Sequence, residues 1–117
     1  MRKHRRPWGH YEVLHKEKGM LVKKLVVNPG KRISLQRHFL RSEAWAVIEG
    51  RGTLTLKYDG LTESRFLFRG DSETIRVGMV HRLTNGEKAP LVVIETQIGE
   101  NLSENDIERL EDDYGRK

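Results

Sequence analysis

The sequence contains no cysteine. That absence excludes disulfide bonds, thiolate metal ligands and cysteine nucleophiles, so a bound metal has to be held by histidine, carboxylate or amide side chains. Long apolar runs are absent too: none approaches the roughly 20 residues of a membrane-spanning helix. The basic N-terminus MRKHRRPWGH also lacks the apolar segment that follows in a secretory signal. We therefore expect a cytoplasmic protein with no membrane partner.

Positive charge is in excess, with a formal net charge of +5 and four basic residues near the N-terminus, Arg2, Lys3, Arg5 and Arg6. Such residues neutralise nucleic-acid phosphates, but no helix-turn-helix pattern or aromatic stacking strand accompanies them. We interpret residues 1–5 as a flexible basic tail and expect no nucleic-acid partner. A phosphorylated small molecule suits a basic domain equally well.

Short apolar or alternating runs dominate the 117 residues, among them MLVKKLVV, EAWAVIE, GTLTLKY and LVVIETQI. Turn signals such as NPG, EGRG, YDG and RGD separate these runs. Many short strands at this spacing predict an all-β sandwich or closed barrel. The length suits one domain over residues 1–117, and we find no repeat or internal linker.

Only the end of the chain has a helical pattern. Ser103 and Asp106 have the form of a capping box, and Ile107, Leu110 and Tyr114 fall on one helical face before Gly115. We therefore expect one short C-terminal α-helix packed against the barrel.

Four polar residues form a candidate metal site. Gln36 and His38 share one face of a strand, because side chains alternate along a strand. The next four residues are enough to turn the chain, which brings Glu43 back across from His38, and His81 begins another short strand. Two imidazoles, one carboxylate and one amide oxygen suit a divalent ion such as zinc, manganese, iron, cobalt or nickel. With neutral histidines the loaded site is net positive and attracts an anionic or oxygen-rich ligand.

Taken singly, these residues have simpler explanations. A histidine on a strand is more often a hydrogen-bonded core or surface residue than a ligand, and Glu43 suits an ordinary strand edge. The spacing of the four residues is what favours a metal site.

The same spacing resembles the two motifs of the cupin superfamily. The first motif consists of Gly30, Gln36, His38, Glu43 and Gly50, with glutamine where the first histidine usually stands. The second consists of Gly70, Gly78, His81 and Asn85, with Arg76 in place of the usual proline.

Further segments resemble the cupin domain at the C-terminus of type II mannose-6-phosphate isomerases, which is usually fused to mannose-1-phosphate guanylyltransferase. They are RPWG, NPGKRISLQ, HRLTN, VIETQIG and DIERLEDDYGR, and the resemblance covers about residues 6–116. It implies a stand-alone domain with the cupin double-stranded β-helix (jelly-roll) barrel, often a homodimer, with Gln36, His38, Glu43 and His81 as metal ligands. The implied reaction interconverts mannose 6-phosphate and fructose 6-phosphate through an enediolate.

The chain departs from this family at three positions. The family's first motif reads approximately Gln-Met-His-His-His-Arg-x-Glu-His-Trp, whereas this chain has QRHFLRSEAW. Phe39, Leu40 and Ala44 thus stand where the family has histidines, while Arg41 and Trp45 are kept. The metal ligands survive these changes.

The isomerase chemistry needs a base that moves a proton and a cation that stabilises the developing negative charge. Arg41 is our candidate for phosphate or enediolate contact, and its alternative is a turn arginine facing water. Glu95, which shares a strand face with Gln97, is our candidate base, and its alternative is a solvent-facing side chain. Lys24 is our candidate phosphate ligand, because one lysine of VKKLVV must point inward. Trp8 and Trp45 are expected in the core.

Three functions remain open from the sequence. The leading hypothesis is a metal-dependent sugar-phosphate isomerase of the type II mannose-6-phosphate isomerase kind. A non-catalytic cupin that binds metal and sugar phosphate is the alternative, favoured by Leu40 and Ala44. An oxygenase is the third, because histidine and carboxylate ligands also bind iron.

Overall fold

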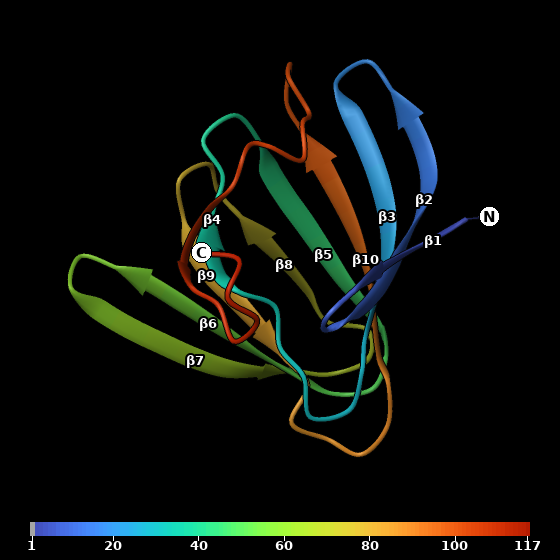
Figure 1. The fold of residues 1–117 in the computed structure, drawn as a ribbon, viewed down its shortest axis with the longest axis vertical. Helices are drawn as coiled ribbons and strands as arrows, with labels where there is room; N and C mark the ends of the chain where they lie inside the picture. Colours follow the sequence, from blue (N-terminus) through green and yellow to red (C-terminus); the bar gives the residue numbers. More distant parts are fainter. Residues whose placement is uncertain (1) are drawn as a thin grey trace.

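The computed structural model describes residues 2–117, in which the chain forms two antiparallel sheets (Figure 1). The strands are β1 (Lys3–Arg6), β2 (Gly9–Glu17), β3 (Met20–Val27), β4 (Leu35–Arg37), β5 (Ser42–Glu49), β6 (Gly52–Tyr58), β7 (Leu61–Leu67), β8 (Ser72–Ile75), β9 (Val80–Thr84), β10 (Leu91–Ile98) and β11 (Glu108–Glu111). The six-stranded sheet has the order β1-β2-β3-β10-β5-β8, and the five-stranded sheet has the order β11-β4-β9-β6-β7.

Strands that are distant in the chain lie side by side in both sheets. Strand β10 lies between β3 and β5, and β9 lies between β4 and β6. Figure 1 shows the β2–β3 and β6–β7 hairpins at opposite sides of the molecule. The prediction of an all-β barrel is confirmed. No helix of the described residues is long and apolar enough to cross a membrane.

The core fills the space between the sheets because each strand turns alternate side chains inward. In β5 the buried residues are Glu43, Trp45 and Val47, whereas Ala44 between them is only half-buried. Trp8 and Trp45 are 8% and 1% exposed, which confirms that both belong to the core. The same alternation carries polar side chains such as Glu43 into the interior.

The predicted C-terminal helix is wrong, since residues 103–117 contain strand β11 and turns but no helix. Strand β11 pairs with β4, so that Arg109 lies opposite Gln36. The capping box does not form because Asp106 accepts hydrogen bonds from the backbone N–H groups of Phe39 and Leu40, at 2.8 and 2.9 Å. The Asp106 carboxylate therefore binds the turn at Phe39 and Leu40 instead of capping a helix.

The predicted flexible tail is also wrong where the structure describes it. Residues 3–6 form β1, which pairs with β2 from Lys3 opposite Glu12 to Arg6 opposite Gly9. Charged side chains are well suited to this strand, because it is an edge of the sheet and its outer face meets water. Met1, the first residue of the expected tail, lies outside the described residues.

Candidate metal centre and its cavity

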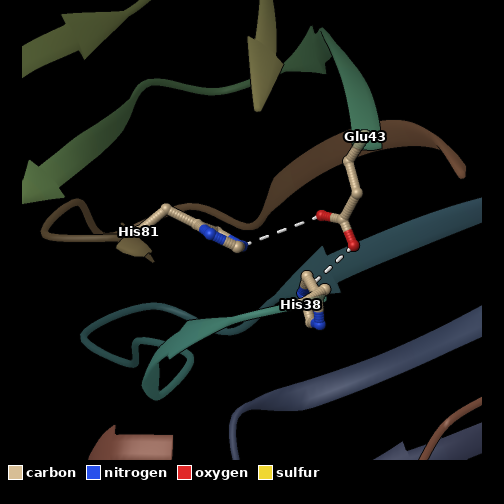
Figure 2. Close-up of side chains that lie close together, drawn as sticks. All are labelled: His38, Glu43 and His81. Atoms are coloured by element: carbon tan, nitrogen blue, oxygen red, sulfur yellow. Dashed lines mark ion pairs between the residues drawn. The ribbon is translucent and has the colours of Figure 1, made fainter. Parts of the chain in front are cut away.

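His38, Glu43 and His81, here called the metal group, converge in the interior from three segments (Figure 2). His38 directly follows β4, Glu43 lies on β5 and His81 lies on β9. The side chains are 4%, 2% and 0% exposed. Glu43 Oε2 lies 3.2 Å from His38 Nε2, and Glu43 Oε1 lies 3.8 Å from His81 Nε2. One ligand atom from each residue falls within 4.8 Å of the others, a spacing suited to a shared metal ion.

Backbone carbonyls orient both imidazoles. His38 Nδ1 lies 2.7 Å from the carbonyl oxygen of Asp106, and His81 Nδ1 lies 2.8 Å from that of Met79. A carbonyl oxygen only accepts hydrogen bonds, so Nδ1 carries the proton on each ring and Nε2 offers its lone pair toward Glu43. His81 Nε2 is buried and has no hydrogen-bond partner within residues 2–117. This orphaned nitrogen fits a divalent metal ion as its missing partner.

The pKa values of both histidines favour the neutral form that metals bind. Burial, followed by the charge of Arg41, lowers the pKa of His38 to about 4. Burial likewise lowers the pKa of His81. At neutral pH both rings are therefore uncharged, and a metal does not have to displace a proton from either.

Gln36 lies beside the metal group on the cavity side. It lies on β4, opposite His81 on β9, and its side chain lines the cavity described below. Its Oε1 accepts a hydrogen bond of 3.1 Å from Ser34 Oγ. Its role as a fourth metal ligand stays a prediction.

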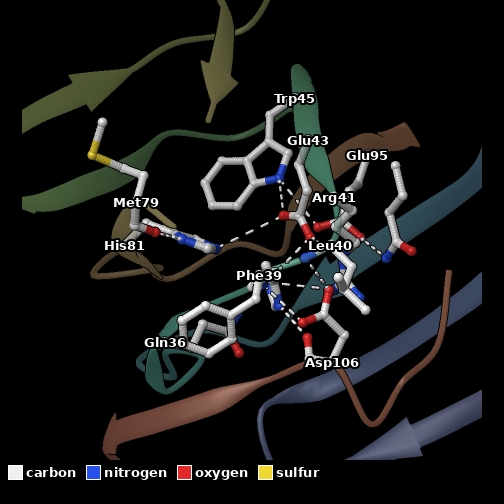
Figure 3. A network of polar contacts seen from close by, with 12 residues as sticks. Gln36, Phe39, Leu40, Arg41, Glu43, Trp45, Met79, His81, Glu95 and Asp106 are labelled. Atoms are coloured by element: carbon white, nitrogen blue, oxygen red, sulfur yellow. Dashed lines mark hydrogen bonds and ion pairs between the residues drawn. The ribbon is translucent and has the colours of Figure 1, made fainter. Parts of the chain in front are cut away.

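Arg41 is buried against the metal group, which excludes a turn arginine facing water (Figure 3). Its Nε donates to Glu43 Oε2 at 2.9 Å, and its guanidinium also donates to His38 Nε2 at 3.3 Å and to the carbonyl oxygen of Ser103 at 3.2 Å. Arg41 therefore supplies a positive counter-charge to the buried carboxylate of Glu43.

Glu95 is buried on β10 and faces the same interior, which excludes a solvent-facing side chain. Trp45 Nε1 donates to both Glu43 Oε1 and Glu95 Oε1, at 3.2 and 3.1 Å (Figure 3). Gln97 Nε2 donates to Glu95 Oε2 at 3.0 Å. Burial, together with the charge of Glu43, raises the pKa of Glu95 to about 7. The sequence analysis predicted that Trp45 lies in the core, but not that its indole N–H donates hydrogen bonds to two carboxylates.

Lys23, not Lys24, is the lysine of β3 that points inward, so the predicted position was wrong by one residue. Lys23 is 7% exposed and lines the cavity, whereas Lys24 is half-buried on the other face. Lys23 lies opposite Glu95 on β10, and burial lowers its pKa. Pairing an inward lysine with an inward glutamate on the neighbouring strand was the signal that could have identified it.

A cavity of about 190 Å³ opens beside the metal group, with His38 in its wall. Seven of the lining side chains are charged: Arg6, Lys23, Arg41, Arg109, Arg116, Glu95 and Glu104. The sequence analysis assigned no site role to Arg6, Arg109, Arg116 or Glu104. Arg109 enters the cavity only because residues 108–111 form a strand beside β4.

The three family histidines that this chain lacks map away from the cavity. Phe39 and Leu40 are 51% and 52% exposed, and Ala44 lies on the opposite face of β5 from Glu43 and Trp45. None of the three belongs to the cavity lining. These replacements therefore leave the metal group and its surroundings intact.

The family described as "Mannose-6-phosphate isomerase C-terminal" matches residues 1–112. The alginate biosynthesis protein AlgA of Pseudomonas aeruginosa is 44% identical over 112 residues, which are 95% of this chain and 22% of that protein. The xanthan biosynthesis protein XanB of Xanthomonas campestris is 42% identical over 115 residues, 98% of this chain and 24% of that protein. A mannose-1-phosphate guanylyltransferase of Salmonella montevideo is 39% identical over 111 residues, 95% of this chain and 23% of that protein. The chain thus spans less than a quarter of these relatives.

Solved structures with the same architecture are more distant in sequence. Oxalate decarboxylase of Lactobacillus farciminis superposes with a TM-score of 0.81 at 16% identity, over 93% of this chain and 33% of that one. The capsular polysaccharide assembling protein CapF of Staphylococcus aureus gives 0.79 at 19% identity, over 93% and 34%. A double-stranded β-helix protein of Klebsiella pneumoniae gives 0.70 at 21% identity, over 83% and 79%. These likenesses confirm the cupin fold, and at such identities they show the fold alone.

Proposed function

Because the chain belongs to the family of mannose-6-phosphate isomerase C-terminal domains, we propose that it is a metal-dependent isomerase that interconverts mannose 6-phosphate and fructose 6-phosphate. One observation carries the proposal most: a buried metal group, in which His81 Nε2 has no hydrogen-bond partner among the described residues, borders a cavity rich in cations. Such a cavity suits an anionic sugar. The family match supports mannose phosphate as the sugar and isomerisation as the reaction.

His38, Glu43 and His81, with Gln36 as the fourth ligand, would hold the divalent ion. When bound, a divalent metal ion polarises the carbonyl and hydroxyl oxygens of a sugar. The donor set of imidazole, carboxylate and amide suits zinc, manganese, iron, cobalt or nickel. The choice among these metals is open to experiment.

Glu95 is the proposed base that carries a proton between C1 and C2 of the sugar. It is the carboxylate in the cavity wall that is not part of the metal group and does not pair with a cation, and Gln97 and Trp45 hold it in place. Arg41 is the proposed cation that stabilises the negative oxygen of the enediolate. Its guanidinium lines the same cavity and already faces His38 and Glu43.

The alternative, a cupin that binds metal and sugar phosphate without turnover, rested on the histidines absent at Leu40 and Ala44. Those positions lie outside the cavity lining, which removes the argument that favoured this alternative. Nothing specific supports the oxygenase. The homodimer and the cytoplasmic location stay predictions.

The test is product analysis of mannose 6-phosphate incubated with metal-loaded protein, beside a double variant, His38→Ala with His81→Ala. We expect fructose 6-phosphate from the wild type alone. Tight binding of mannose 6-phosphate without product, with the metal confirmed by elemental analysis, would establish the binding cupin instead. Oxygen consumption by the iron-loaded protein would identify the oxygenase.

A further inference from the structure

Lys23 is a buried cation without a counter-charge of its own. It is 7% exposed, and it forms no ion pair with any residue of the described chain. Glu95 lies directly opposite on β10, yet Lys23 Nζ lies instead over the Tyr11 ring, 4.1 Å from its centroid. A buried ammonium group without a paired charge is unfavourable, so its position at the cavity wall favours an anionic ligand.

Arg109 is a second cavity cation without an ion pair in the described chain, although its side chain is only half-buried. Its Nε is buried and has no hydrogen-bond partner in the part of the chain that the structure describes. It lies on β11, opposite Gln36. Strand β11 belongs to the five-stranded sheet, whereas Lys23 belongs to the six-stranded sheet. Burial, followed by the charge of the neighbouring Arg116, lowers its pKa.

The other three cations of the cavity already have partners. Arg116 binds both oxygens of Asp112 at 2.8 and 2.9 Å. Arg6 pairs with Glu104 at 3.2 Å, and Arg41 pairs with Glu43 at 2.9 Å. Two cavity cations are thus left for a ligand.

Glu95 and Glu104 are the carboxylates of the lining, and Glu104, 62% exposed, lies at the mouth.

We propose that Lys23 and Arg109 form a phosphate subsite, which receives the phosphate group of the sugar phosphate while the sugar faces His38 and Glu95. The proposal rests on the function proposed above and adds where each end of the substrate lies. A phosphate dianion supplies the charge that both cations lack, and an ammonium with a guanidinium is a common pairing for phosphate. Arg41, engaged with Glu43, stays free of this role.

The chain offers a matched control for this subsite. Lys23→Met removes the charge but keeps an unbranched apolar side chain, and Lys24→Met makes the same change on the neighbouring residue of β3 that does not line the cavity. Arg109→Gln tests the opposite wall. The affinities of metal-loaded protein for mannose 6-phosphate, inorganic phosphate and unphosphorylated mannose are measured by titration calorimetry.

We expect Lys23→Met and Arg109→Gln each to weaken binding of mannose 6-phosphate and of inorganic phosphate at least tenfold, with mannose binding unchanged. Lys24→Met should leave all three affinities unchanged. Equal loss in Lys23→Met and Lys24→Met, or equal loss for mannose and mannose 6-phosphate, would overturn the subsite. Inorganic phosphate that binds alone, without any preference for the sugar phosphate, would reduce it to a free-phosphate site and also contradict the proposal.

Folding and function are separated by two further measurements. Thermal unfolding shows whether Lys23→Met folds, and Lys23→Arg, which keeps the cation, should retain phosphate binding within a few-fold. If the wild type forms no fructose 6-phosphate but its binding still depends on Lys23, the isomerase fails and the subsite stands. If product forms and KM is the same in wild type, Lys23→Met and Arg109→Gln, the subsite fails and the isomerase stands.

Discussion

The metal group and the C-terminal segment, residues 103–116, both border the cavity, yet they hold their polar side chains by different means. The metal group is almost fully buried, and its residues contact one another, backbone carbonyls and the buried side chains of Arg41 and Trp45. The C-terminal segment relies more on ion pairs that meet water, such as Asp113 with Arg32, whose side chains are 43% and 41% exposed. Solvent and salt screen exposed pairs but hardly affect buried contacts. The metal group is therefore pre-organised, whereas the stability of the C-terminal segment should depend on pH and salt.

The largest expected effect comes from removing one ligand of the metal group. His81→Ala deletes the nitrogen that has no other partner in the described chain, so we expect metal binding and product formation to be lost. The loss should exceed the roughly 10- to 100-fold that follows when an outer partner of a metal ligand is removed. Elemental analysis after dialysis measures it. Retention of one metal per chain by His81→Ala would exclude His81 as a ligand.

Arg41 distinguishes the metal-free from the metal-loaded state. Arg41→Met leaves Glu43 buried without its cation, which should lower the free energy of unfolding of the metal-free protein by about 3 kcal/mol. A bound dication should restore most of that loss, while product formation stays low. Urea unfolding with a chelator measures the loss of unfolding free energy, and urea unfolding with metal measures how much of it the metal restores. The control is Arg51→Met, which breaks an exposed pair with Glu87 and should cost less than about 1 kcal/mol.

Asp106 tests how strictly the two regions can be separated, because it belongs to the C-terminal segment but binds the turn after His38. Asp106→Ala removes two partly buried hydrogen bonds to the N–H groups of Phe39 and Leu40 and should destabilise the fold by about 2 kcal/mol. Metal affinity should fall as well, since this turn positions His38. Asp113→Ala is the control. Equal effects of the two substitutions would mean that the turn needs no support from the C-terminal segment.

The smallest effect is a pH dependence confined to the C-terminal segment. Hydrogen bonds from Arg116 lower the pKa of Asp112 to about 2. A carboxylate with a lowered pKa stabilises the fold fully above its unfolded pKa of about 4, and that contribution is lost as the pH falls through about 2. Asp112→Asn should therefore reduce stability by about 1 kcal/mol at pH 5 and progressively less toward pH 2. Urea unfolding across this range checks it, and parallel curves for wild type and variant would contradict it.

Much of the fold and the metal group was predictable, because both depend on local patterns. Alternating apolar runs separated by turn signals indicate strands. Because side chains alternate along a strand, Gln36 and His38 share a face, and a turn after them brings Glu43 to the same side. The ambiguity of VKKLVV shows the limit of this reasoning. Apolar residues occupy both faces of that strand, so alternation alone does not say whether Lys23 or Lys24 points inward.

The C-terminal segment was mispredicted because its partners are distant in the chain. Asp106 binds backbone groups 66 and 67 residues away, and strand β11 forms only because β4 offers it an open edge. A capping pattern indicates only a local preference for a helix. Here the hydrogen bonds that Asp106 forms with distant residues override that preference.

By itself, the sequence determined an all-β barrel with two histidines and a glutamate brought together, since residue type and strand periodicity are local properties, and its resemblance to the cupin motifs identified which barrel it is. Only the tertiary structure decided which cations face the cavity and which of them lack a partner. That outcome depends on the register between β3 and β10 and on the pairing of β11 with β4. Both pairings join segments far apart in the chain, where burial and hydrogen bonding select one arrangement that no short stretch of sequence specifies.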